Sequence, residues 1–309
     1  PRYGNIEELR QLLQEAHKRN LKVITELVVN HTSDQHPWFQ RARRAPKGSP
    51  ERDYYVWSDD PTKYKDVRII FTDYEASNWT WDPVAQQYYW HRFFHHQPDL
   101  NYDSPHVQEE IIKVLDYWCE MGVDGFRLDI FNVIYKDAEF RNNPFAFQVV
   151  PTDEDPSSFF QQPKYTINQP ESFAFAREFR NVCDEFGEKL SLGEVNGGRT
   201  IIRKFLGEKT NNGLSLVFDF EMLNFKFTAD YFRLLVREME AQYPEPFMPV
   251  YVFSNHDKHR SIYRLGDDLR KAKLLAMFQL TVRGVPCMYY GEEIGMTDSR
   301  FPFAVALDP

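Results

Sequence analysis

The chain has 309 residues, a length that suits one large α/β domain or two to three smaller ones. Its 46 acidic and 37 basic residues give a formal charge of -9, without a run of Lys or Arg, so nucleic acid and anionic membranes are disfavoured as partners. No stretch approaches the roughly 18 to 20 apolar residues of a membrane span. The three cysteines, Cys119, Cys183 and Cys287, are widely spaced and odd in number, which indicates neither a disulfide framework nor a zinc cluster. We therefore expect a protein of a reducing compartment, the cytoplasm.

The first part of the chain predicts a helix followed by a buried strand. Apolar residues recur at helical spacing over 6–19, with Asn5 as the N-cap. Residues 21–29 follow as a short apolar run rich in β-branched residues, typical of a strand covered on both faces of a parallel sheet. From 32 to 97 the composition changes: Pro, Asp, Trp and Tyr become frequent, and apolar and polar residues alternate in short stretches at 67–72 and 87–94. This segment predicts an inserted lobe of irregular structure with short strands.

The rest of the chain repeats the helix-to-strand step. Helices are predicted over 107–121, 172–186, 201–206, 229–239 and 269–282, and strands over 123–130, 190–195, 214–220, 250–254 and 285–290. Residues 131–170 are a polar excursion punctuated by proline. Six such steps without hairpin signals indicate a parallel sheet, open or closed. A closed (β/α) barrel needs eight strands, so the sheet is open or two strands are missing.

Charged and polar residues follow four of the predicted strands at their carboxyl ends. They are Asn30 and His31, Arg127 and Asp129, Glu194, and Asn255 with His256 and Asp257. Each alone is explained by a helix cap or a solvated ion pair, but together they indicate a site, because charges at the ends of apolar strands cost desolvation energy. Arg127 lies two residues before Asp129 and so faces the same side, where it favours the ionised carboxylate. Two carboxylates across a cleft with a third nearby suit glycoside hydrolysis.

These segments resemble, in order and spacing, the four signature segments of the α-amylase family of glycoside hydrolases. They are residues 26–31 (ELVVNH), 125–129 (GFRLD), 193–196 (GEVN) and 254–257 (SNHD). Residues 97–101 (QPDLN) resemble the further segment of the branch that contains oligo-1,6-glucosidases, α-glucosidases and trehalose synthases. Glu26 departs from the family pattern, which has Asp there, and we expect only a changed local hydrogen bond.

The resemblance implies a (β/α)8 TIM barrel with an irregular α+β lobe inserted after its third strand. Residues 1–31 and 98–309 would form two parts of the catalytic barrel, and 32–97 the inserted domain B. The first two strands and the C-terminal β-domain of the family would be absent, so that about six of eight strands remain. Because the chain also begins without Met, we expect a piece of a longer gene product that is inactive, or nearly so, by itself.

The resemblance also implies roles for individual residues. Asp129 would be the nucleophile, Glu194 the general acid/base and Asp257 the stabiliser of the transition state. The residues expected to contact the substrate are His31, Arg127, His256, Ile130 and Arg260. No cofactor is required for this chemistry. Calcium stays an alternative, because Asn30 stands where many α-amylases have a calcium ligand.

Two features conflict on the reaction. Residues 31–39, 78–83 and 89–94 look most like trehalose synthases, whereas 130–137 resemble oligo-1,6-glucosidases, and the bulky Ile130 favours action on α-1,6 linkages over α-1,4. The first hypothesis is retaining hydrolysis of short α-glucosides, α-1,6 or α-1,4 linked, through a covalent glucosyl-enzyme intermediate. The alternatives are a trehalose synthase working by intramolecular transglucosylation and a catalytically inactive binding relative. The expected partner is a disaccharide or short oligosaccharide, and the oligomeric state stays open.

Overall fold

The computed structural model describes residues 3–146, 161–187 and 189–299. The chain forms two compact units, Pro1–Val217 and Phe218–Pro309. The expected barrel parts 1–31 and 98–309 include residues 1–2, 188 and 300–309, which lie outside the described residues, as does the middle of the excursion at 131–170. Within the described ranges, no helix combines the length and the apolar character needed to cross a bilayer.

A four-stranded parallel sheet forms the centre of the first unit. Its strands are β1 (Ile24–Val28), β5 (Gly125–Asp129), β6 (Leu190–Gly193) and β7 (Leu216–Val217), in the order β1-β5-β6-β7. Glu26 pairs with Arg127 across β1 and β5, and Leu128 pairs with Gly193 across β5 and β6. A Cβ at Gly193 would lie 2.5 Å from Leu214 Cδ1, so any larger residue at the end of β6 would make the Leu214 side chain move. The predicted strands are confirmed, although β7 is shorter than expected.

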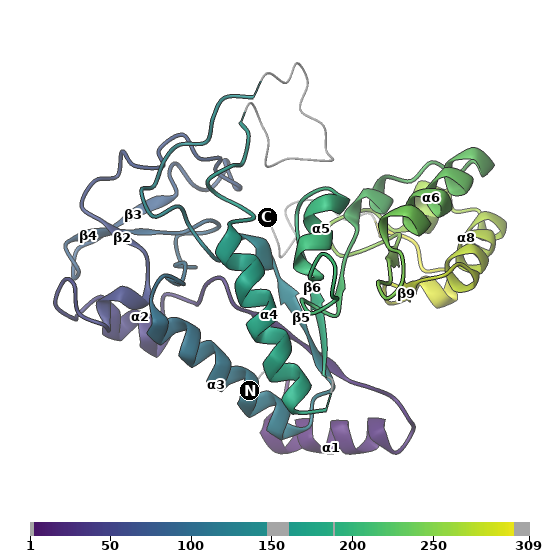
Figure 1. Cartoon of the computed structure of the whole chain (residues 1–309), viewed down its shortest axis with the longest axis horizontal. Coiled ribbons are helices and arrows are strands. Elements are labelled where there is room, and N and C mark those ends of the chain that lie inside the picture. Colours follow the sequence, from purple (N-terminus) through teal and green to yellow (C-terminus); the bar gives the residue numbers. More distant parts are fainter. Residues whose placement is uncertain (1–2, 147–160, 188, 300–309) are drawn as a thin grey trace. The chain divides into compact units, whose positions relative to one another are not determined.

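Each of these strands is preceded by a helix, as the sequence predicts. The helices are α1 (Ile6–His17), α3 (Pro105–Met121), α4 (Pro170–Glu185) and α5 (Arg199–Phe205). The Asn5 side chain caps α1 in a capping box with Glu8, and α3 ends at Gly122, whose φ of 102° suits a residue without a Cβ. The helices α3 and α4 pack side by side next to the sheet (Figure 1).

The inserted lobe contains an antiparallel sheet of three short strands. They are β2 (Trp57–Ser58), β4 (Gln87–Trp90) and β3 (Trp79–Asp82), in the order β2-β4-β3. Two short helices, α2 (Pro37–Ala42) and η1 (Arg52–Tyr54), precede them. The lobe core is aromatic: Tyr64, Trp79 and Trp90 are buried together with two valines, and Phe140 from beyond the lobe packs on it. The predicted strand at 67–72 is wrong, because this segment consists of turns and bends.

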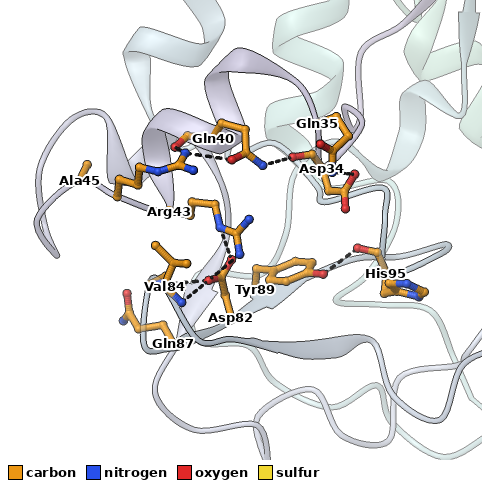
Figure 2. Close-up of polar contacts among 12 residues, drawn as sticks. Asp34, Gln35, Gln40, Arg43, Ala45, Asp82, Val84, Gln87, Tyr89 and His95 are labelled. Carbon is orange, nitrogen blue, oxygen red and sulfur yellow. Dashed lines mark hydrogen bonds and ion pairs between the residues drawn. The ribbon is translucent and has the colours of Figure 1, made fainter.

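An ion pair fastens α2 to the hairpin of β3 and β4 (Figure 2). The Arg43 guanidinium contacts both carboxylate oxygens of Asp82, with Nε 2.9 Å from Oδ2 and Nη2 3.1 Å from Oδ1. Asp82 Oδ1 also accepts hydrogen bonds from the backbone N–H groups of Val84 and Ala85. Both oxygens of the buried Asp82 carboxylate thus have polar partners, and the carboxylate holds the turn after β3 as well as the helix α2.

The second unit contains a pair of parallel strands and three helices. The strands are β8 (Val250–Val252) and β9 (Val285–Cys287), and an isolated parallel bridge joins Phe218 to Val250. The helices are α6 (Ala229–Gln242), α7 (Ser261–Arg264) and α8 (Leu269–Thr281), with the short helices η4 (Phe220–Asn224) and η5 (Glu292–Ile294).

In the first unit, one further short helix, η2 (Phe131–Val133), begins two residues after the end of β5. The fold is therefore α/β, with parallel sheets and an antiparallel lobe, as the sequence predicts.

Candidate active site

One arginine joins three carboxylates at the carboxyl end of the central sheet. Arg127 and Asp129 lie two residues apart on β5, and Glu194 directly follows β6. The Arg127 guanidinium donates from Nη1 to Asp129 Oδ1 at 2.6 Å and from Nη2 to Glu194 Oε2. Nη1 also donates to Glu26 Oε1 on β1. The structure therefore brings Arg127, Asp129 and Glu194 together, as their positions at strand ends predict.

Glu194 is the most perturbed acid of this cluster. Its side chain is only 11% exposed. Burial raises the pKa of Glu194 to about 7, and Asp129 adds to this shift by its charge and by a hydrogen bond, while the charge of Arg127 opposes it. Burial by itself would lower the pKa of Arg127, but the three carboxylates outweigh it and the pKa is raised. One carboxyl group of the pair thus holds a proton near neutral pH, and the cation beside it stays charged.

His31 lies at the end of β1 beside this cluster. It forms an isolated antiparallel bridge with Asp99, and its ring centroid lies 5.6 Å from that of Phe93. Burial lowers the pKa of His31, although the charges of Asp99 and Asp129 oppose the shift. The imidazole is therefore neutral at pH 7, and its two ring nitrogens lie within hydrogen-bond distance of side-chain amides, Nδ1 at 3.3 Å from Asn30 Nδ2 and Nε2 at 3.4 Å from Gln97 Nε2.

The buried ammonium group of Lys136 lies next to Asn30. Lys136 Nζ donates to Asn30 Oδ1 at 3.0 Å and lies 2.8 Å from Asp99 Oδ2. Calcium is bound by six to eight oxygen ligands, several of them carboxylates, so these residues do not fit that ion. Over the described ranges, no group of three or more His, Cys, Asp or Glu side chains is arranged to hold a metal.

Ile130 has an unusual backbone next to Asp129. Its φ of 36° and ψ of 45° lie in the left-handed region, which β-branched residues avoid. Such a conformation costs about 1–3 kcal/mol and persists only where the surroundings enforce it. The side chain is buried with Val133 and Ile167, and Phe93 packs against them. The strained residue therefore directly follows Asp129, and its side chain packs into the apolar cluster of Val133, Ile167 and Phe93.

The remaining predicted site residues belong to the second unit. His256 and Asp257 follow β8 and are exposed, with His256 Nε2 3.4 Å from Asp257 Oδ1. Asn255 Oδ1 accepts hydrogen bonds from the N–H groups of Asp257 and Lys258, both at 3.0 Å, and so sets the turn that presents Asp257. The strand-end rule found Asn255 but gave it no role.

Arg260 is buried and packs on two tyrosines. Its Nη1 donates to the Tyr290 carbonyl at 2.6 Å. Its guanidinium carbon lies 4.6 Å from the ring centroid of Tyr289 and 4.7 Å from that of Tyr290. These contacts hold the two tyrosines after β9 against the loop after β8.

Sequence reasoning gave too little weight to Glu26. Its carboxylate binds the same guanidinium as Asp129 and Glu194. The signal was available, because a parallel pairing of the first two predicted strands places residue 26 opposite Arg127. The expected change in a local hydrogen bond therefore concerns the central arginine of the site.

Comparison with known proteins identifies the family. Residues 1–307 match the family "Alpha amylase, catalytic domain". The chain belongs to the α-amylase family. Trehalose synthase of Thermus thermophilus is 36% identical over 97% of this chain and 32% of its own length. The oligo-1,6-glucosidase of Parageobacillus thermoglucosidasius is 32% identical over 97% of this chain and 54% of its own length.

Solved structures agree with this assignment. The crystal structure of the α-glucosyl transfer enzyme XgtA superimposes with a TM-score of 0.86 at 30% identity, over 97% of this chain and 57% of that protein. The α/β fold is thus that of α-amylase-family catalytic domains. This chain spans 57% or less of the length of each of these three proteins.

Proposed function

We propose that this α-amylase-family chain carries the catalytic centre of a retaining α-glucosidase. The observation that supports the proposal most is the sharing of one guanidinium by Asp129 and Glu194, of which Glu194 has its pKa raised to about 7. A retaining glycosidase needs such a pair, one carboxylate ionised for attack and one carboxyl protonated for departure. The same pair is an argument against an inactive binding relative.

The mechanism assigns a role to each group. Asp129 attacks the anomeric carbon of a terminal glucose, and the bond from that carbon to the leaving oxygen breaks as Glu194 gives this oxygen its proton. Arg127 holds the Asp129 carboxylate in place through the hydrogen bond from its Nη1. Glu194, now ionised, takes a proton from water, which displaces Asp129 and releases glucose. Asp257 supports the positive charge of both transition states.

Activity in this proposal belongs to the longer gene product. A TIM barrel requires eight strands, and the described residues supply four in one parallel sheet and two in another. The chain also spans only about half of the oligo-1,6-glucosidase that it resembles. The activity is therefore to be measured on the gene product at its natural length.

Trehalose synthesis is the second candidate. It shares every step up to the glucosyl-enzyme, after which the released glucose, instead of water, attacks the intermediate. The relative from Thermus thermophilus, at 36% identity, carries this name, whereas the oligo-1,6-glucosidase stands at 32%. Residues 78–83 and 89–94 of the inserted lobe also resemble trehalose synthases.

A substrate panel separates the two reactions. The gene product is incubated separately with maltose, isomaltose and trehalose, and the products are resolved by chromatography. Glucose as the main product, released fastest from isomaltose, supports the α-1,6-leaning glucosidase. Trehalose formed from maltose with little glucose supports the synthase, and no reaction with any of the three contradicts both.

Ile130 provides a matched test of linkage preference. Ile130→Thr replaces the bulky wall beside Asp129 with a smaller polar one, and we expect the ratio of kcat/KM for isomaltose over maltose to fall about tenfold. Ile130→Val, which keeps the apolar β-branched shape, should leave this ratio within about twofold. Equal ratios for all three proteins would mean that Ile130 does not select the linkage.

The pKa of Glu194 predicts the basic side of the pH profile. Because the protonated form is the acid, and burial raises its pKa to about 7, kcat/KM should be constant on the acidic side of pH 7 and fall about tenfold for each pH unit above it. Initial rates between pH 5 and 9 measure this. A profile that stays flat up to pH 9 would show that Glu194 is not the acid.

A further inference from the structure

The loop that carries Asp257 is closed at its base inside the second unit. It runs from Ser254, two residues after β8, to Ser261, the first residue of α7. Both serines are buried, whereas His256 and Asp257 near its middle are exposed. The N–H of Ser261 donates to Ser254 Oγ at 2.7 Å, so the two ends of the loop contact each other directly.

A single carboxylate joins both ends. Glu292 Oε1 accepts hydrogen bonds from Ser254 Oγ at 2.5 Å and from Ser261 Oγ at 2.6 Å. Its other oxygen, Oε2, accepts from the N–H of Tyr289 at 2.8 Å. Glu292 begins η5, in the segment after β9. The loop is therefore held to the end of the neighbouring parallel strand by one side chain that belongs to neither end of the loop.

The chemistry of these contacts favours a carboxylate. Three donors converge on the two oxygens, and an ionised carboxylate accepts on both of them, which also strengthens each bond. A glutamine in its place presents an NH2 group either to the two serine hydroxyls or to the Tyr289 N–H. In the first orientation both serine hydroxyls lose their acceptor and can only accept from the NH2 group, and in the second the NH2 group meets the Tyr289 N–H, donor against donor; both orientations also lose the charge that strengthens the bonds.

We propose that Glu292 is the positioning residue of Asp257, holding the base of the loop 254–261 so that Asp257 keeps the orientation needed in the transition state. The inference rests on the proposed function, in which Asp257 is the stabiliser. Glu292 touches no reacting atom and acts through Ser254, three residues before Asp257. The sequence shows two adjacent glutamates at 292 and 293, and the structure turns only the first of them toward the loop.

Further contacts outside Glu292 keep the variant folded. Arg260 N donates to the Asp298 carboxylate, and His259 Nδ1 lies 2.8 Å from Asp298 Oδ2. Arg264 binds the carbonyl of Phe253. Glu293 offers the matched control, since it is exposed and no hydrogen bond or ion pair is found for it within the described part of the chain.

The test compares Glu292→Gln with Glu293→Gln in the full-length gene product. We expect Glu292→Gln to lower kcat for the preferred α-glucoside about 10- to 100-fold with KM changed less than about threefold, because Asp257 acts in the transition state. Hydrogen exchange of the amides in 254–261, followed by mass spectrometry, should be faster than in the wild type. Glu293→Gln should match the wild type in all three quantities.

A second variant checks that Glu292 acts through the serines. Ser254→Ala removes a donor to Glu292 Oε1 as well as the acceptor of the Ser261 N–H. In the double variant with Glu292→Gln the effect on kcat should be smaller than the sum of the two single effects, because both changes break the link between Glu292 and Ser254. Full additivity would overturn the proposal, as would wild-type kcat in Glu292→Gln. A loss of kcat in that variant without faster exchange in the loop would overturn it as well.

Failure of the proposed function gives a different result. If the wild type cleaves no α-glucoside, Asp257 does not stabilise a transition state. Glu292 then cannot serve to orient Asp257 for catalysis. Wild-type activity combined with wild-type behaviour of Glu292→Gln refutes the positioning role alone. The exchange rates show in both cases whether the carboxylate holds the loop.

Discussion

Asp129→Asn is expected to lower kcat for α-glucoside cleavage by a factor of about 10⁴ or more in the full-length gene product. The amide is a far poorer nucleophile than the carboxylate, so no glucosyl-enzyme forms. The geometry should persist, because the amide oxygen of the variant would still accept the hydrogen bond that Arg127 Nη1 now gives to Asp129 at 2.6 Å. Initial rates on the preferred substrate measure the loss, and circular dichroism checks the fold.

Glu26→Gln is the matched control for this variant. Glu26 binds the same guanidinium as Asp129, but from β1 and with a side chain that is more than half exposed. Removing its charge leaves the nucleophile in place, and we expect kcat to fall no more than about tenfold. If Asp129→Asn kept the wild-type rate, the nucleophile would be another residue. A comparable loss in both variants would mean that Arg127, rather than Asp129, limits the reaction.

Covalent trapping gives a second readout for the same residue. A slow fluorinated α-glucoside should add one glucosyl unit to the wild-type protein, located by mass spectrometry on the peptide that contains Asp129. The variant Asp129→Asn should show no such addition. A glucosyl unit found on another carboxylate would contradict the assignment directly.

The convergence of Arg127, Asp129 and Glu194 could be predicted from the sequence because the strands that carry them could be recognised there. Short apolar runs with β-branched residues mark buried parallel strands, and parallel strands end at one edge of a sheet. The side chains that follow them must therefore meet. The period of two along β5 adds that Arg127 and Asp129 share a face.

Other contacts of the site could not be predicted, for two physical reasons. Lys136 meets Asn30 across a separation of 106 residues, and local patterns carry no information about such pairs. The choice between Glu292 and Glu293 depends on the backbone of η5, which directs one carboxylate inward and the other to solvent. The helix α2, with six residues, was also missed because it is too short to show a helical period.

The ion pair of Lys136 and Asp99 is the second feature for which a large effect is expected. The Asp99 side chain is fully buried, and that of Lys136 is 8% exposed. Burial lowers the pKa of Lys136, while the charge of Asp99 and the hydrogen bond to it oppose that shift. Asp99 Oδ1 also accepts from the N–H of Arg92 at 3.0 Å, so the carboxylate ties the end of the lobe to the segment after η2.

Lys136→Met is expected to reduce the free energy of unfolding by about 3–5 kcal/mol, because it leaves the buried Asp99 carboxylate without its cation. The double variant Lys136→Met/Asp99→Asn should recover only part of this loss: it removes the carboxylate charge that Lys136 balanced, but the buried Arg92 then loses its interaction with that charge. Lys113→Met, which removes an exposed lysine from Glu109 and Glu110 on α3, should shift the unfolding midpoint far less. Denaturant unfolding of the three variants measures these differences. Equal midpoints for Lys136→Met and Lys113→Met would show that the buried pair does not hold the lobe to the catalytic sheet.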